Sequence, residues 1–224
     1  VLAVFPFVPV LLLWLKPGFL PPALKPVDTG ASHTALDLWR IAPLRNTFIA
    51  SGILSSAWDL FQFYLPVYGH HIGLSASAIG VVLGVFALAT FMIRVVLQWL
   101  VKHYRETQIL TASIFVAAFA FVLFPFFTNA YALAAVPFLL GLGVGCGQPM
   151  SMSLIYALAP HGRASESAGL RVTVNNVMHL AIPLAFGSLG TAFGYMPVFL
   201  TNSAMLVAGG MLMRKAHLID SKSA

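Results

Sequence analysis

Long apolar runs separated by short polar connections make up most of the chain. Six of these runs reach the roughly 20 residues that a membrane-spanning helix needs. They predict six full spans at residues 46–68, 76–100, 108–127, 131–158, 168–190 and 195–213. A shorter apolar run at residues 1–15 predicts the end of a further transmembrane helix. The expected fold is therefore all-α and integral to a membrane.

Two segments outside the spans are more polar. Residues 16–45 form a proline-bearing connector between the first run and the six spans. Within it, the apolar positions of residues 36–41 predict a short amphipathic helix at the membrane surface, with Ser32 or Thr34 as its N-cap. Residues 214–224 form a basic tail.

Composition supports a membrane protein. Only 8% of the residues are charged and the mean hydropathy is +0.91, whereas soluble domains carry about 25% charged residues. The net charge of +6 lies in short loops and not in a basic stripe with interleaved aromatics, so nucleic acid is not an expected partner. All twelve Lys and Arg residues fall on one side of the predicted layout. The positive-inside rule makes that side cytoplasmic, together with the connector and the C-terminus, and the expected location is a bacterial inner membrane.

The span at residues 46–68 carries a carboxylate near its middle, where it costs at least about 2.5–3.5 kcal/mol. Five residues share one helical face at spacings of three or four: Ser51, Ser55, Asp59, Gln62 and Pro66. We expect this face to line a protein interior or a wet cavity. Because apolar surroundings disfavour the charged form, Asp59 is a candidate proton carrier. The alternative is a structural Asp held by polar partners on a neighbouring helix.

A second polar set lies in the span at residues 168–190. Arg171, Asn175 and His179 step by four, with Asn176 beside them. Counted at about 1.5 Å per residue, His179 lies near the membrane midplane, at a depth similar to Asp59. The two can face one cavity, as groups that contact substrate or protons. The alternative is interhelical hydrogen bonding, worth only about 0.6 kcal/mol in membranes.

Helix-breaking residues interrupt the span at residues 131–158: Gly141, Gly143, Gly145, Gly147 and Pro149. They predict a bend or a local unwinding, which is typical of a transporter site. Gln148 adds an uncharged hydrogen-bonding group there. A G-x-x-x-G pair at Gly80 and Gly84 predicts close helix packing in the second full span.

Three segments resemble the major facilitator superfamily. Residues 73–110 are similar to its eighth helix and following loop, residues 141–160 to its glycine-rich tenth helix, and residues 162–190 to the loop and eleventh helix. Arg94, Lys102 and Arg105 stand where the family's cytoplasmic loop signature lies, although Gln98 replaces its usual glycine and Lys102 stands near its acidic residue. With Arg171, which borders the next loop, these three basic residues are candidates for a cytoplasmic gate.

The resemblance covers the whole chain as the end of helix six, the central loop and helices seven to twelve. It implies a six-helix bundle of two three-helix repeats, a small-molecule substrate, and an N-terminal six-helix half outside this sequence. It also implies secondary transport by alternating access around a central cavity.

No cofactor or metal is expected. The sequence contains no nucleophile motif, no GxxxxGK[ST] and no carboxylate pair at depth, so we expect a proton-coupled transporter and not an enzyme. Two alternatives remain, a seven-helix receptor and a half-transporter that dimerises. Against the receptor, no span holds a lysine for retinal, and DRY and NPxxY motifs are absent.

Overall fold

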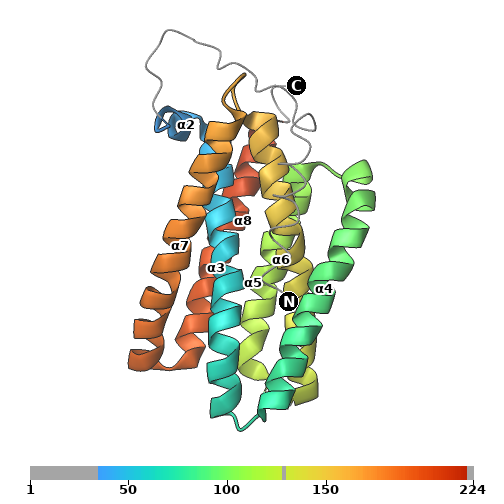
Figure 1. Cartoon of the computed structure of the whole chain (residues 1–224), viewed down its shortest axis with the longest axis vertical. Helices are drawn as coiled ribbons and strands as arrows, with labels where there is room; N and C mark the ends of the chain where they lie inside the picture. Colours follow the sequence, from blue (N-terminus) through green and yellow to red (C-terminus); the bar gives the residue numbers. More distant parts are fainter. Residues whose placement is uncertain (1–34, 128–129, 221–224) are drawn as a thin grey trace, which may run out of the picture. The chain divides into compact units, whose positions relative to one another are not determined.

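The computed structural model describes residues 35–127 and 130–220, with side chains for residues 35–127 and 135–215. The described residues fold into helices and contain no strand (Figure 1). In chain order the elements are α2 (Asp37–Arg40), α3 (Ala42–His71), α4 (Ala76–His103), α5 (Glu106–Leu123), the 3-10 turn η2 (Phe124–Phe126), α6 (Ala130–Leu158), α7 (Ala164–Phe193) and α8 (Tyr195–Asp220). The predicted run at residues 1–15 and both predicted N-cap residues lie outside the described residues.

Each of the six predicted spans corresponds to one long helix. Among the described residues, five helices are long and apolar enough to cross a membrane, namely α4, α5 with η2, α6, α7 and α8. The remaining helix, α3, has 30 residues and is therefore about 45 Å long, but its polar positions make it less apolar. It contacts each of the other five long helices. A helix that other helices enclose exposes little surface to lipid and can therefore be more polar. That α3 crosses the membrane remains a prediction, which its length and its position in the bundle support.

Consecutive long helices run in opposite directions. The start of α3, the α4–α5 turn and the α6–α7 turn therefore lie at one end, uppermost in Figure 1. The basic residues Lys102, Arg105 and Arg163 lie in or beside these turns. At the opposite end, Gly73 and Gly194 adopt φ values of 80° and 83°, a left-handed conformation that glycine accepts without steric cost and that ends a helix.

The short helix predicted in the connector is present as α2, a single turn of four residues. Its N-cap is Leu36, whose side chain accepts no hydrogen bond, and not the predicted Ser32 or Thr34. Leu38 is fully buried and packs with Leu44, Phe48 and Ile155, whereas Leu36 is 71% exposed. The segment therefore presents one apolar face to the helices and another to its surroundings.

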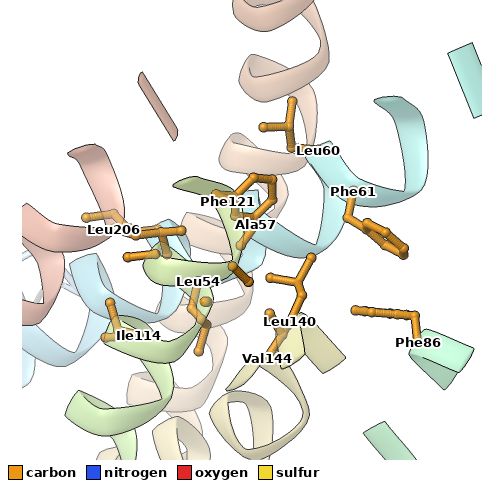
Figure 2. Close-up of a cluster of buried hydrophobic side chains, with 14 of the residues drawn as sticks. Leu54, Ala57, Leu60, Phe61, Phe86, Ile114, Phe121, Leu140, Val144 and Leu206 are labelled. Atoms are coloured by element: carbon orange, nitrogen blue, oxygen red, sulfur yellow. The ribbon is translucent and has the colours of Figure 1, made fainter. Parts of the chain in front are cut away.

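The main hydrophobic core forms around α3. Figure 2 shows Leu54, Ala57 and Phe61 of α3 among side chains from the neighbouring helices. Phe61 packs on Phe86 of α4 with ring centroids 4.4 Å apart. The remaining labelled members of the cluster are Leu60, Ile114, Phe121, Leu140, Val144 and Leu206. Side chains from all six long helices contribute to this cluster, and α3 is the helix that contacts each of the other five.

The glycines of α6 serve close packing. Here the predicted local unwinding is wrong, because α6 is a continuous helix through all four glycines and Pro149. A Cβ on Gly141 would lie 2.6 Å from the carbonyl oxygen of Phe86 in α4, and one on Gly143 would lie 2.9 Å from that of Ser113 in α5. A Cβ on Gly145 would again meet α4, and one on Gly147 would overlap Leu54 of α3. The four glycines thus bring α6 against three different helices.

The G-x-x-x-G pair in α4 behaves differently. A Cβ on Gly80 or Gly84 would meet nothing within 4 Å among the described residues. The close packing that the sequence predicts for this pair is therefore absent from this bundle, because the pair lies on a face that no described helix covers.

Replacing Gly141 by alanine is expected to lower the stability of the folded protein by about 1–3 kcal/mol, because the new methyl group has to displace backbone of α4. Gly80→Ala is the matched control. It adds the same methyl group to a helix interior without a clash and is expected to be neutral or slightly stabilising. Thermal unfolding of both variants in detergent measures the difference, and equal unfolding midpoints would contradict it.

Candidate functional site

Polar side chains connect α3 with α7 along one line of contact. At the end where both helices begin, the Ser51 hydroxyl donates a hydrogen bond of 3.2 Å to Asn175 Oδ1, and both residues are buried. Two turns further along α3, Asp59 Oδ2 accepts a hydrogen bond from His179 Nδ1, which is an ion pair when the imidazole is protonated. The predicted polar faces of α3 and α7 therefore meet each other.

The Asp59–His179 pair is the accessible end of this line. The His179 side chain is 44% exposed and the Asp59 side chain 17%, whereas Ser51 and Asn175 are buried. A carboxylate that is hydrogen-bonded to an imidazole shares a proton with it across that bond, so the pair can take part in proton transfer. The sequence places Asp59 and His179 at a similar depth, facing one cavity, and in the structure the two side chains contact each other. The same contact also provides the polar partner on a neighbouring helix that a purely structural role of Asp59 requires.

A second polar cluster joins α3, α6 and α7 around Arg171. Its Nη2 donates to Gln148 Oε1 at 2.5 Å and to the Ser151 hydroxyl at 2.8 Å. Gln148 Nε2 in turn donates to the Ser55 hydroxyl at 3.4 Å. Arg171 is only 6% exposed, and its Nε has no hydrogen-bond partner in the described part of the chain.

This position changes the interpretation of Arg171. The sequence places it beside a cytoplasmic loop as a gate residue, but it lies inside the bundle, on the second turn of α7. Its partners Gln148, Ser151 and the thioether of Met152 are all uncharged. Arg171 is thus a buried cation that hydrogen bonds hold between α6 and α7, and it makes no ion pair within the described residues.

Two of the predicted pathway residues lie apart from these contacts. Gln62 and Asn176 are both exposed. Gln62 lines a hollow of about 540 Å³ between α3 and α4, together with Trp58 and Arg94. The Gln62 and Asn176 side chains are thus open to the surroundings of the bundle. Ser55, Asn175 and Gln148, in contrast, form hydrogen bonds to residues of neighbouring helices.

The remaining gate candidates lie on or after α4. Arg94 and Lys102 line a second hollow, of about 870 Å³, which reaches Pro149 of α6. Arg105 is the N-cap of α5, where its backbone N–H donates to Gln108 Oε1 at 3.2 Å. It therefore helps to begin a helix, and these residues do not contact Arg171.

Two further polar pairs were not predicted from the sequence. Ser56 of α3 donates to Asn202 Oδ1 of α8 at 3.1 Å, and both are fully buried. Ser153 of α6 donates to Glu106 Oε1 at the start of α5 at 2.5 Å. A lone asparagine in an apolar span was a usable sign for the first pair, since such residues usually bond across helices. Within the described ranges, no group of three or more His, Cys, Asp or Glu residues is placed to hold a metal ion.

Comparison with known families decides the identity of the bundle. The sequence profile of the Major Facilitator Superfamily matches residues 1–183, well over half of the chain. The chain belongs to the major facilitator superfamily. It is accordingly a multi-pass membrane transporter of a small molecule and not a seven-helix receptor, and the all-α bundle agrees with this family. No curated protein matches the sequence.

Proposed function

We propose that this transporter moves a small organic solute by alternating access and couples that movement to protons through Asp59 and His179. The observation that carries the proposal is the contact between these two side chains, one on α3 and one on α7, on an accessible side of the bundle. Unlike the ion pair of Arg163 and Glu166, this one joins two different long helices.

The contacts along α3 and α7 suggest how a proton would act. Protonation of Asp59 removes its negative charge and with it the attraction to a protonated His179. The buried bond from Ser51 to Asn175 does not depend on that charge. Loss of the Asp59–His179 attraction would therefore free one stretch of the α3–α7 contact while the other stays joined, which supports a hinge-like movement of α7.

The roles of the other residues follow from their exposure. Gln62, three residues after Asp59 in α3, and Asn176, three residues before His179 in α7, are exposed and are assigned to the solute. Ser55, Asn175 and Gln148 are assigned to holding the helices, because their polar groups already have partners. Rocking of this bundle against a second one around a midplane site would complete the transport cycle.

Transport by the protein in liposomes tests the proposal. Radiolabelled monocarboxylates, hexoses, amino acids and lipophilic cations are offered under an inward proton gradient. We expect one class to accumulate against its own gradient and to be released by a protonophore. Accumulation that follows an imposed sodium gradient and ignores the protonophore would contradict proton coupling.

A further inference from the structure

Two hollows on the same side of α4 share one cation. The first, of about 540 Å³, lies between α3 and α4 and is lined by Trp58, Gln62 and Phe86 among others. The second, of about 870 Å³, extends along α4 to Lys102 and to Pro149 of α6. Arg94 lines both of them. The volume of the first is within the range of sites for small organic ligands.

Arg94 is placed as a ligand-binding group would be. It lies nine residues before the end of α4 at His103, about 13 Å along the helix, and so inside the length of a bilayer. Its side chain is exposed, and among the described residues it has no hydrogen-bond or ion-pair partner. A guanidinium at that depth is unfavourable without an anion beside it. We therefore expect an anionic ligand to bind next to Arg94.

Three acids of the described chain contact residues other than Arg94. Asp59 contacts His179, Glu106 accepts from Ser153, and Glu166 pairs with Arg163. No acidic residue lines either hollow in the described part of the chain. An anion for Arg94 therefore has to come from outside these residues.

The walls of the first hollow indicate what the anion carries. Trp58 meets Phe86 edge-on with ring centroids 5.0 Å apart, and Phe61 supports Phe86 from the core. The Thr90 hydroxyl is occupied, because it donates to the Phe86 carbonyl oxygen at 2.9 Å. Apart from Arg94, the Gln62 amide and the Trp58 indole N–H are the polar groups left to orient a ligand on an otherwise apolar and aromatic wall.

We propose that this hollow binds an organic monocarboxylate with an apolar body. The carboxylate takes the planar fork of Arg94, which matches it in geometry, and the Gln62 amide donates to it. The apolar body lies against Trp58 and Phe86. A single cation with no acid beside it is neutralised by one negative charge, whereas a phosphate monoester would leave negative charge in excess. Lys102 in the adjoining hollow extends the positive potential towards the end of α4.

The assignment names a substrate class for the proposed transporter and rests on that function, but binding can be measured without transport. The protein in lipid nanodiscs is titrated with radiolabelled phenylacetate, and phenylacetamide and phenyl phosphate serve as competitors. We expect saturable phenylacetate binding, no competition by the neutral amide, and weaker competition by the phosphate.

Variants of Arg94 decide whether this residue is responsible. Arg94→Gln is expected to weaken phenylacetate binding by at least about tenfold, and Arg94→Lys to weaken it less, because lysine keeps the charge and loses the fork. Arg214→Gln removes an exposed cation of α8 and is expected to leave the affinity unchanged. Unfolding midpoints of all three variants show whether the fold is retained, and Arg94→Lys serves if the glutamine variant does not fold.

Three results would overturn the inference: no saturable phenylacetate binding, equal affinity in the wild type and Arg94→Gln, or equally strong competition by phenylacetamide or phenyl phosphate. Failure of the proposed function has a different signature. Carboxylate binding that depends on Arg94, without any proton-driven accumulation in liposomes, would leave this site in place and remove the proton coupling.

Discussion

Asp59→Asn is expected to abolish uphill accumulation of the solute while leaving exchange of solute across the membrane intact. Asparagine keeps the shape of the side chain and can still hydrogen-bond to His179, so the contact between α3 and α7 survives. It cannot take up a proton at the transport site, so the proton gradient no longer acts on the cycle. Net uptake should then stop when the solute concentrations on the two sides are equal.

Two liposome assays measure this result, namely proton-driven accumulation of labelled solute and counterflow without a gradient. Glu166→Gln is the matched control, because it neutralises an acid at the start of α7 that pairs with Arg163 and lies away from the Asp59–His179 contact. The control should accumulate solute as the wild type does. Accumulation by Asp59→Asn that a protonophore still releases would exclude Asp59 as the proton carrier.

Gln148→Leu is expected to be one of the most destabilising substitutions of similar volume in the bundle, with a loss of about 1.5–3 kcal/mol. The substitution removes the acceptor that lies 2.5 Å from Arg171 Nη2, and the guanidinium is too deeply buried for water to replace it. Even in the wild type, Arg171 Nε has no hydrogen-bond partner within the described residues. A cation that is already incompletely bonded therefore loses its closest contact.

The double variant Gln148→Leu, Arg171→Met is expected to recover most of that loss. Methionine removes the buried charge together with its desolvation cost, and replacing buried ionic groups by apolar ones of similar volume is often neutral or stabilising. The unfolding midpoints of the wild type, both single variants and the double variant form a double-mutant cycle. If the double variant is less stable than Gln148→Leu alone, Arg171 contributes more through its own contacts than its burial costs.

The helices of this protein were predictable because a bilayer leaves few choices for the backbone. Every N–H and C=O group in the hydrocarbon region needs an internal partner, so apolar runs of about 20 residues become helices. Each predicted span corresponds to a long helix, five of which are apolar enough to cross a membrane, and the profile match confirms the family that three segments resemble. The exact ends were less predictable. For example, α3 begins at Ala42, inside the predicted connector, because Pro43 is accepted in the first turn of a helix.

The polar faces were predictable too, but their partners were not. Periodicity places Ser51 and Asp59 on one face of α3, and Asn175 and His179 on one face of α7. That Ser51 meets Asn175 and Asp59 meets His179 depends on α3 and α7 lying side by side in the same direction. A helical repeat describes one helix and contains no information on which other helix covers a face.

The sequence by itself determined the all-helical membrane fold and the faces that carry Asp59 and His179, since both depend on local composition and spacing, and its resemblance to known relatives indicated the family. Only the tertiary structure separated Gly80 from Gly141, whose G-x-x-x-G patterns are alike, because a close approach requires a neighbour on that side. It also placed Arg171 inside the bundle and Arg94 beside an aromatic hollow. Both are arginines in apolar helices, and their roles differ because packing encloses one guanidinium and leaves the other open to a ligand.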